Sequence, residues 1–407
     1  MTESTTAVRP TALVVGGGIG GMAAAVALQR VGWRVSLLER APEFTEVGAG
    51  VQLGPNVTRV LRAWGLDDAV ARVAAFPDRI TARSALSGAD LGTLPLGARC
   101  LERYGAPYAS IHRADLHRLL WHAARDRAGV TLRNEQWVEQ LSDDETGPVS
   151  VTTVDGHAEQ GDALVGADGV WSRVRQLVLN DGKPRTTGHV AYRAMLVQQQ
   201  LPQHLRSSQV TVWLGPRLHV VQYPVRGGDW MNVVAIVDGP VPAHPDDWSL
   251  HASTADIEAA TAHTCAPLRD LILAAPSASA NAEPWRLWAL ADRPPVSAAA
   301  QMARGRVALL GDAAHPMRPY LAQGAGMAIE DAQALATCLA FNAEPVAARL
   351  ARYADMRWRR CARVQAGAIR NGGIYHATGL MRLGRDAALR ALGERVMDRP
   401  WLYSYTS

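Results

Sequence analysis

Residues 11–21 read TALVVGGGIGG, and this stretch decides the fold of the chain. Residues 11–15, four of them apolar, predict a buried strand, and the largely apolar residues 22–31 predict a helix that Gly32 ends. A second apolar run at positions 34–38 predicts another strand. Strand, glycine-rich turn, helix and strand within about 30 residues form the start of a Rossmann βαβ unit.

The glycines of this turn have separate tasks in a dinucleotide site. Gly16 permits the tight turn, Gly18 lets a pyrophosphate approach the backbone, and Gly21 lets the helix pack closely on the strand. The pyrophosphate then lies at the helix N-terminus, whose free N–H groups favour anions. Glu39, at the end of the second strand, is placed to accept hydrogen bonds from an adenosine ribose. The cofactor-binding residues predicted here are Gly16, Gly18, Ile19, Gly20, Gly21 and Glu39.

Composition indicates an ordinary globular enzyme. The 407 residues suffice for two or three domains, with 48% hydrophobic and 20% charged residues. No run approaches the roughly 18 consecutive apolar residues of a membrane span, and residues 1–9 lack the apolar core of a signal peptide. The four cysteines show no CxxC spacing, so we expect neither a disulfide framework nor a metal site. These features predict a cytoplasmic protein without a membrane partner.

The net charge of +4 raises the question of nucleic-acid binding. Nearly all basic residues are arginines, since Lys183 is the single lysine, and they are scattered along the chain. No ribbon of aromatic and basic residues interleaves them, as a nucleic-acid surface would require. We therefore expect no nucleic-acid partner.

The middle of the chain has a different character. Three short apolar runs between residues 209 and 237 are separated by turns at 215–217 and 226–229, a spacing typical of antiparallel hairpins. Beyond them the strand–glycine–helix pattern returns and ends in a helix from about residue 326 to 339. The tail after this helix also has a helical pattern. We expect the antiparallel sheet to be a second domain inserted into the first.

The Rossmann motif alone does not separate NAD from FAD, but two later motifs do. Residues 163–175, ALVGADGVWSRVR, and 306–331, RVALLGDAAHPMRPYLAQGAGMAIED, resemble those of class A flavoprotein monooxygenases, the para-hydroxybenzoate and salicylate hydroxylase group. The resemblance implies that Asp168 serves both FAD and a nicotinamide nucleotide, and that Asp312 contacts the ribityl chain of FAD. It also implies that the loop and helix start at Gly324, Ala325 and Gly326 lie near the flavin ring.

The resemblance extends over nearly the whole chain. Arg40 and Arg113 match family arginines that contact FAD. A second GxGxxG motif is absent, which implies that NAD(P)H visits a groove as a co-substrate. The implied fold class is α/β, with a Rossmann-type FAD-binding domain, an inserted antiparallel-sheet substrate domain and C-terminal helices. The expected division is 1–182 with 290–345 for the FAD-binding domain, 183–289 for the substrate domain and 346–407 for the C-terminal helices.

Residues 218–225, LHVVQYPV, form the candidate substrate strand. Side chains alternate between the faces of a strand, so His219, Val221 and Tyr223 share one face. His219 and Tyr223 are roughly 13 Å apart along the strand, which leaves room for one aromatic ring above Val221. The spacing resembles the substrate strand of 3-hydroxybenzoate 6-hydroxylase and 6-hydroxynicotinate 3-monooxygenase, where the pair contacts the ring hydroxyl. Without that resemblance, a satisfied sheet histidine and a core tyrosine are the simpler interpretation.

Further residues are candidates for the same pocket. Gln52 lies where the hydroxynicotinate enzyme has a catalytic histidine, and a glutamine can hydrogen-bond but cannot act as a base. Tyr320 lies where that enzyme has another histidine, so hydroxynicotinate is a poor match as the substrate. Arg318 is either a partner for a substrate carboxylate or a surface arginine. His315 is expected to be structural, and Trp213 is a candidate wall of the pocket.

His219 is expected to take the proton of the substrate's phenol, in relay with Tyr223. A phenol has a pKa near 10 and is therefore mostly neutral at pH 7, whereas histidine titrates near pH 6.5 and suits the role of base. The predicted catalytic residues are His219, Tyr223 and Gln52, and the predicted substrate-binding residues are Gln52, Val221, Tyr223, Trp213 and Tyr320.

These features together predict an FAD-dependent monooxygenase that uses NAD(P)H and O₂ to hydroxylate a small phenolic aromatic, such as salicylate or a hydroxybenzoate. The resemblance implies that the ring attacks a flavin C4a-hydroperoxide, and that CO₂ leaves where the attacked carbon bears a carboxylate. One alternative is hydroxylation or epoxidation of a hydroxypyridine or a larger natural product on the same fold. Another is a non-catalytic FAD-binding redox or regulatory protein. We expect a monomer or a homodimer.

Overall fold

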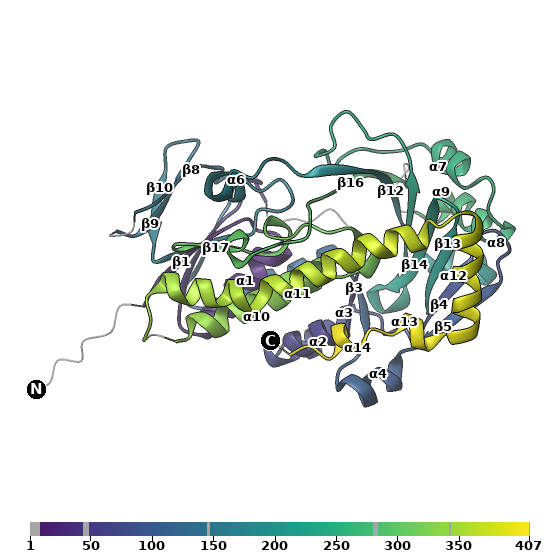
Figure 1. The fold of residues 1–407 in the computed structure, drawn as a ribbon, viewed down its shortest axis with the longest axis horizontal. Coiled ribbons are helices and arrows are strands. Elements are labelled where there is room, and N and C mark those ends of the chain that lie inside the picture. The colour runs from purple at the N-terminus through teal and green to yellow at the C-terminus, as the bar shows by residue number, and fades with distance from the viewer. Residues whose placement is uncertain (1–8, 44–48, 145–146, 280–283, 342, 407) are drawn as a thin grey trace, which may run out of the picture.

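The computed structural model describes residues 9–406 apart from 44–48, 145–146, 280–283 and 342, so nearly all of the polar N-terminal segment lies outside the described residues. Two large sheets lie in opposite halves of the molecule, and one long helix runs across the space in front of both (Figure 1). This arrangement confirms the predicted α/β class with a separate antiparallel sheet.

The first sheet is built around the predicted Rossmann unit. Its strand order is β17-β18-β11-β1-β2-β7, and all neighbours run parallel except β17 and β18. The first helix begins at Ile19, earlier than expected, because the glycines that follow are already helical. The bounds are β1 Thr11–Val15, α1 Ile19–Arg30, β2 Arg34–Leu38, β7 Val130–Arg133, β11 Ala163–Gly166, β17 Ala303–Arg304 and β18 Val307–Leu309.

The second sheet carries the candidate substrate strand. Its order is β16-β12-β15-β14-β13-β4-β5, antiparallel except where β4 runs beside β13. The three strands expected between residues 209 and 237 are present as β13, β14 and β15. Strands β4 and β5 come from within the range 1–182 that was expected in the other domain, so this sheet recruits more of the chain than 183–289. The bounds are β4 Arg79–Ser84, β5 Asp90–Pro95, β12 Arg185–Val197, β13 Val210–Gly215, β14 Leu218–Val225, β15 Trp230–Asp238 and β16 Arg286–Asp292.

Shorter elements connect the two sheets. The small ribbon of β3 and β6 reaches the substrate strand, where the Ser110 hydroxyl donates a 2.6 Å hydrogen bond to the carbonyl oxygen of Pro224. The bounds of these strands are β3 Gly50–Leu53, β6 Ala109–His112, β8 Val138–Asp143, β9 Val149–Thr153 and β10 Ala158–Gly161. The connecting helices are α2 Pro55–Ala63, α3 Asp67–Val73, α4 Gly97–Tyr104, α5 Arg113–Arg125, α6 Arg173–Leu179, α7 Thr254–Thr261, α8 Ala266–Leu273 and α9 Ala275–Ala278.

The tail of the chain is helical, as expected. Helix α10 packs against α1, and α11 then crosses from the parallel sheet to the antiparallel sheet along the front of the view (Figure 1). Helices α12 and α13 cover β5, and α14 returns to α2. The bounds are α10 Gly324–Leu339, α11 Val346–Tyr375, α12 Gly379–Leu392, α13 Glu394–Met397 and α14 Pro400–Tyr403. Among the described helices none combines the length and the apolar character that crossing a bilayer requires.

The two faces of the antiparallel sheet have different neighbours. The outer face buries an apolar core that includes Val220, Val233 and Trp285. The opposite face, called the inner face below, is met by β3 and by Tyr320 and Tyr375 of the C-terminal part. The predicted site residues of the substrate strand lie on the inner face.

Candidate active site

The glycine-rich turn after β1 has the shape that a pyrophosphate site requires. Gly16 has a φ of +106°, and a Cβ there would come within 2.5 Å of the carbonyl oxygen of Ala167. A Cβ on Gly21 would come within 1.8 Å of the carbonyl oxygen of Gly16, so the helix can lie this close to the turn only with glycine at position 21. Glu39 lies at the same turn, because its Oε2 accepts a 2.5 Å hydrogen bond from the N–H of Gly17.

Two helix N-termini lie beside each other and fit an FAD. Helix α1 follows the extended Gly18, and α10 begins at Gly324; in both, no described side chain caps the first turn and no acid lies within it. Free N–H groups at such ends favour anions and electron-rich groups. The Oδ1 of Asp312 would lie 4.0 Å from a Cβ on Gly324, so a carboxylate stands at the second helix end. The predicted residues at these two ends are Gly18, Ile19, Gly20, Gly324, Ala325 and Gly326.

The two arginines expected at FAD lie in different surroundings. Arg40 is exposed, and its guanidinium carbon lies 5.6 Å from the centre of the Trp137 ring. Arg113 begins α5, and its backbone N–H donates to the carbonyl oxygen of Ala49. Its charge also helps to lower the pKa of Arg193, which places Arg113 near the inner face of the antiparallel sheet. Contact of either arginine with FAD stays a prediction.

Asp168 has a structural task that the sequence did not reveal. One carboxylate oxygen accepts a 2.5 Å hydrogen bond from the Ser172 hydroxyl, and the other accepts from the N–H groups of Arg173 and Val174 at 2.7 and 3.0 Å. Both oxygens are therefore engaged at the start of α6. Burial raises the pKa of Asp168, while these hydrogen bonds oppose the rise. Its predicted role toward FAD and the nicotinamide nucleotide remains a prediction.

A buried ionic group lies beneath the GDAAHP segment, and we call it the closed cluster: His315, Asp331, Arg357, Glu330 and Arg360. Asp331 accepts hydrogen bonds from His315 Nε2 at 2.6 Å, Arg357 Nε at 2.7 Å and the N–H of Gly311 at 3.0 Å. Glu330 pairs with Arg357 at 2.9 Å and with Arg360 at 2.7 Å. Because Gly311 directly precedes Asp312, the cluster holds the segment that carries the predicted ribityl contact.

On the inner face of the antiparallel sheet, side chains of the neighbouring strands β14, β15 and β12 line up in rows across the strands. Strand register places Val221 beside Val234 and Val234 beside Arg193, so these three form one row across β14, β15 and β12. His219 and Tyr223 lie in the rows on either side. The predicted arrangement of a histidine and a tyrosine flanking an apolar floor is therefore present.

Tyr223 is held at one end of this face by the β3 ribbon. Its hydroxyl is hydrogen-bonded to the side chain of Gln52, whose Oε1 also accepts a 2.5 Å hydrogen bond from the Tyr108 hydroxyl. Burial raises the pKa of Tyr223, so its hydroxyl stays protonated. A Cβ on Gly50 would come within 2.4 Å of the Tyr223 ring, so β3 can lie this close only with glycine there. Gln52 and Tyr223, predicted separately, are thus neighbours.

Arg193 is a candidate site residue that the sequence interpretation did not include. It lies on the inner face between the rows of His219 and Tyr223, with its guanidinium carbon 3.9 Å from the centre of the Trp288 ring. Its Nε is buried without a hydrogen-bond partner, and no described acid forms an ion pair with it. Burial lowers the pKa of Arg193 to about 9. Arg318, for which a carboxylate partner and a surface position were both left open, is paired with Asp292 at 2.7 Å.

His219 lies at the other end of the face. With His376 and Asp238 it forms a group that we call the histidine chain, and His189 and Tyr320 contact this group from the side. His219 Nδ1 is 2.9 Å from His376 Nε2, and His376 Nδ1 is 2.9 Å from Asp238 Oδ1. Tyr320, predicted in the pocket, packs with its ring centre 5.2 Å from that of His219 and is hydrogen-bonded to His189. Burial and the two neighbouring histidines hold the pKa of His219 well below its ordinary value.

Trp213 does not line the pocket, and that prediction is wrong. Strand register places it opposite Val220, whose side chain points to the outer face, and Trp213 packs in the outer core. Its indole N–H donates a 2.9 Å hydrogen bond to Gln222 on the same side. A cavity of about 330 Å³ on that side is lined in part by Trp213, Gln222 and Arg83, so it is separated from His219 by the sheet itself.

Two groups of described residues have the composition of a metal site. Their members are His189, Asp238 and His376 in one group, and His315, Asp331 and Cys361 in the other. In each, the donor atoms already bond to one another, through His376 to Asp238 and through His315 to Asp331. We assign neither group to a metal ion.

Comparisons with known proteins agree with this geometry. The chain matches the family model described as FAD binding domain over residues 9–368. It is 38% identical over 396 residues to 3-hydroxybenzoate 6-hydroxylase from Polaromonas naphthalenivorans (strain CJ2), covering 97% of this chain and 95% of that protein. It is 37% identical over 404 residues to 3-amino-4-hydroxybenzoate 2-monooxygenase PtnB3 from Streptomyces platensis, covering 98% and 96%.

The fold is also similar to a solved structure that contains the cofactor. The crystal structure of Klebsiella pneumoniae HpxO complexed with FAD and uric acid matches with a TM-score of 0.83 and 26% identity, covering 97% of this chain and 96% of that one. The family match spans most of the chain, and the helix ends, the turn glycines and Glu39 fit FAD. This chain therefore belongs to the FAD-binding family of flavoprotein monooxygenases that hydroxylate aromatic compounds.

Proposed function

We propose that this enzyme hydroxylates a benzoate that already carries a ring hydroxyl, with NAD(P)H and O₂ as co-substrates. The observation that carries the proposal is the pairing, on one face of one sheet, of a half-buried cation with a neutral histidine. Arg193 lies in the row between those of His219 and Tyr223. Val221 and Val234 belong to the same row, and their apolar side chains form a floor suited to an aromatic ring. We further propose a cytoplasmic monomer or homodimer.

Arg193 supports a carboxylate on the substrate. The guanidinium of Arg193 is half-buried, with its Nε buried and unpartnered, and an anion that enters beside it offsets the cost of that burial. Arginine presents its N–H groups in a planar fork that matches a carboxylate in two parallel hydrogen bonds. The Trp288 ring, whose centre lies 3.9 Å from the guanidinium carbon, supports the guanidinium on one side. The substrate carboxylate is therefore the anion that completes this end of the pocket.

His219 supports a phenol on the substrate. Its depressed pKa keeps the imidazole neutral at pH 7, and a neutral imidazole can accept a proton. Among the described residues its Nε2 has no hydrogen-bond partner, which leaves that atom for the substrate hydroxyl. Bound FAD supplies the redox chemistry that activates oxygen. The task of the chain is then to orient the ring, exclude water and remove the phenol proton, which raises the electron density of the ring.

The test is a substrate panel scored by NAD(P)H oxidation and product mass. 3-Hydroxybenzoate, salicylate and 3-amino-4-hydroxybenzoate carry both groups, whereas benzoate lacks the hydroxyl and phenol lacks the carboxylate. We expect at least one compound of the first set to stimulate NAD(P)H oxidation and to gain one oxygen atom. The mass also shows whether CO₂ is lost. Equal hydroxylation of phenol would contradict the proposed carboxylate site, and stimulation by a hydroxypyridine or a larger polycyclic phenol alone would favour a different substrate class.

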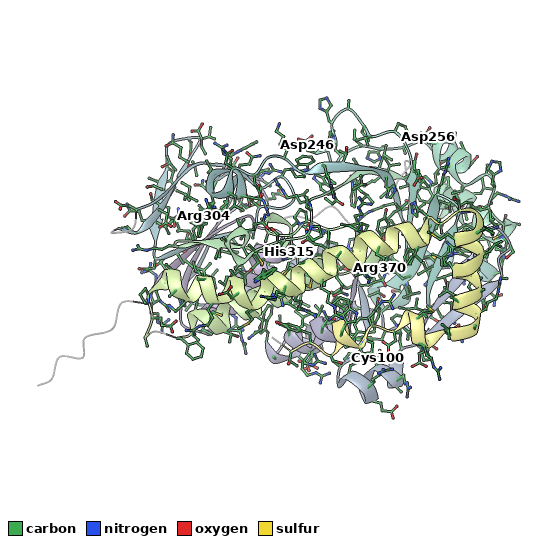
Figure 2. All side chains as sticks on the ribbon, viewed as in Figure 1. Cys100, Asp246, Asp256, Arg304, His315 and Arg370 are labelled. Carbon is green, nitrogen blue, oxygen red and sulfur yellow. The ribbon has the colours of Figure 1, made fainter. Side chains whose placement is uncertain are left out.

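An arginine variant tests the carboxylate site directly. Arg193→Met keeps much of the side-chain volume and removes the charge, so we expect KM for the hydroxybenzoate to rise about 10- to 200-fold, the range of a lost charge-assisted hydrogen-bonded pair. Arg370→Met is the matched control, because Arg370 is exposed on α11 (Figure 2). The KM of the control should match wild type. An unchanged KM in Arg193→Met would remove Arg193 from substrate recognition.

A further inference from the structure

We propose that His376 and Asp238 act with His219 as a proton relay, which carries the phenol proton of the substrate from the inner face to solvent at Asp238. His376 is the middle carrier, and Asp238 also sets the ring tautomers that leave His219 ready to act as a base. The inference rests on the proposed function, since it concerns the proton of a phenolic substrate. It departs from the expectation that Tyr223 is the relay partner of His219.

The exposed fraction of the side chains rises along the histidine chain, from His219 through His376 to Asp238. His219 is 2% exposed, the side chain of His376 is 7% exposed and that of Asp238 is 43% exposed. The two contacts that join them are each 2.9 Å, which is hydrogen-bond distance. Tyr223, by contrast, is bonded to Gln52 at the other end of the face. The exit for a proton from His219 is therefore through His376.

Asp238 determines which nitrogen of each ring carries the hydrogen. An ionised carboxylate can only accept, so His376 Nδ1 must carry the N–H and donate it. His376 Nε2 then has only a lone pair and must accept from His219 Nδ1–H. His219 is left with a bare Nε2, and that atom has no partner among the described residues. The carboxylate thus fixes His219 in the tautomer that can accept a proton from a substrate.

A second arm ends at the same carboxylate. His189 Nε2 lies 3.3 Å from Asp238 Oδ1, and the hydroxyl of Tyr320 is hydrogen-bonded to His189 Nδ1. The nearby carboxylate favours the hydrogen on His189 Nε2, which leaves His189 Nδ1 to accept from the Tyr320 hydroxyl. The orientation of Tyr320 against His219 is therefore also set from Asp238. Gly372 makes room for this tyrosine, since a Cβ there would come within 2.7 Å of the Tyr320 ring.

His219 needs a relay because it cannot keep a proton. It is buried, and His376 and His189 both disfavour a positive charge on it. A transfer along the chain avoids that charge: the O–H bond of the phenol breaks and its proton goes to His219 Nε2, while the Nδ1 proton of His219 goes to His376 Nε2. The Nδ1 proton of His376 then goes to Asp238 Oδ1, and from there to water. The products are a phenolate and two neutral imidazoles, and the reverse transfer reprotonates the product and restores both rings.

Several charged and titratable groups face this chain besides its own members. Tyr375 packs on His219, with ring centres 5.2 Å apart. Arg318 and Arg385 both lower the pKa of His376, after burial, while Asp238 raises it. Arg318 is in turn neutralised by Asp292. These arginines disfavour a positive charge on His376, so a proton on this ring is passed on toward Asp238.

The experiment that tests the relay measures the ionisation of a bound phenol in the absence of turnover. The holoenzyme is titrated with 3-hydroxybenzoate in the absence of NAD(P)H, and the phenolate fraction is read from the ultraviolet difference spectrum between pH 6 and pH 9. We expect wild type to bind phenolate well below the phenol's solution pKa near 10. Asp238→Asn, whose amide can donate as well as accept, should move the apparent pKa of the bound phenol upward by about one to two units.

Turnover and rescue provide the second readout. Asp238→Asn should lower kcat for hydroxylation about 10- to 100-fold with little change in KM, and should shift the pH profile toward alkaline values. His376→Gln should do the same, and Asp238→Glu should restore most of the rate. The matched control is Asp246→Asn, which removes an exposed carboxylate from a loop at the edge of the molecule (Figure 2) and should leave both readouts at wild-type values. Flavin content confirms that each variant is folded.

The possible failures are distinguishable. If 3-hydroxybenzoate and the other phenolic benzoates do not bind, the proposed function is wrong and the relay falls with it. If they bind and ionise equally in wild type and in Asp238→Asn, the relay is wrong while the proposed function stands. If only stability changes in the variants, with the same bound-phenol pKa, the histidine chain is structural and the inference is overturned.

Discussion

Two groups of histidine and acidic residues can be compared among the described residues. The closed cluster is buried, whereas the histidine chain runs from a buried histidine to an exposed carboxylate. In the closed cluster, His315 and Asp331 are 0% exposed and Asp331 is bonded on both oxygens. Burial alone would lower the pKa of His315, but Cys361 and Asp331 raise it well above its ordinary value. In the histidine chain, burial lowers the pKa of His219, and the chain ends at an exposed carboxylate.

The difference shows how environment assigns a role to the same residue type. A histidine whose charge is matched by buried partners holds its proton and stabilises the fold. A histidine that cannot hold a charge, with one nitrogen unbonded among the described residues and the other bonded toward an exposed carboxylate, can exchange a proton. The comparison therefore separates residues whose loss should unfold the protein from residues whose loss should only slow the reaction.

The largest effect is expected from His219→Ala. A positioned base contributes about 10²- to 10⁴-fold, so hydroxylation per folded molecule should slow by that order while FAD stays bound. The fraction of NAD(P)H oxidised without product should rise. Product formed per NAD(P)H consumed, followed across pH, measures both effects. Wild-type coupling and an unchanged pH profile in the variant would make His219 a sheet histidine only.

Breaking the closed cluster should act on stability instead. Asp331→Asn removes one buried charge and leaves Arg357 and His315 without their shared partner, which typically costs about 3–5 kcal/mol. Denaturant unfolding of the holoenzyme measures the loss, and the rate per folded, flavin-bound molecule should stay close to wild type. A variant with normal stability but a large catalytic defect would reverse the roles that we assign to the two groups.

The contribution of the closed cluster to the free energy of unfolding should depend on pH in the acid range. Burial alone would raise the pKa of Asp331, but His315 and Arg357 hold it at about 2. A depressed carboxylate pKa stabilises the fold above the unfolded value near 4, and this contribution of about 2 kcal/mol is lost as pH falls through the folded value. The stability difference between wild type and Asp331→Asn should therefore shrink from pH 4 toward pH 2. A constant difference over that range would contradict the depressed pKa.

The smallest effect is expected from Trp213→Phe. Trp213 lies on the outer face, so the change should leave KM and kcat within about twofold and cost about 1 kcal/mol through lost packing and the lost hydrogen bond to Gln222. Steady-state kinetics and a melting curve are sufficient. A large rise in KM would mean that the outer face also contributes to substrate binding.

Local patterns in the sequence were sufficient to predict the Rossmann start and the three hairpin strands. Glycines at fixed spacing and alternating apolar residues are signals that short segments carry by themselves. The same alternation correctly placed His219 and Tyr223 on one face, because both belong to a single strand. The prediction for Trp213 was wrong because its face relative to His219 depends on the register between two strands. The sequence of a single strand does not encode that register.

The remaining features depend on contacts between distant segments. His219 and His376 are 157 positions apart, and Arg193 joins the pocket only through the pairing of β12 with β15. Strand β4 lies beside β13 in parallel, more than a hundred residues away, so no hairpin signal could assign it to the second sheet. The sequence interpretation consequently placed His219 and Tyr223 on one face, but it did not bring Arg193, His376 or Asp238 to them.

The length of α11 sets the spacing between the closed cluster and the histidine chain. This 30-residue helix holds Arg357 against Asp331 in its first half and delivers Tyr375 and His376 to the pocket at its end, about five turns later. Inserting or deleting one residue between these points would rotate the end by about 100° and shift it by about 1.5 Å. His376 would then leave His219 while Arg357 kept its ion pair. Among related chains, this span should therefore tolerate substitution on its exposed side but not a change in residue number.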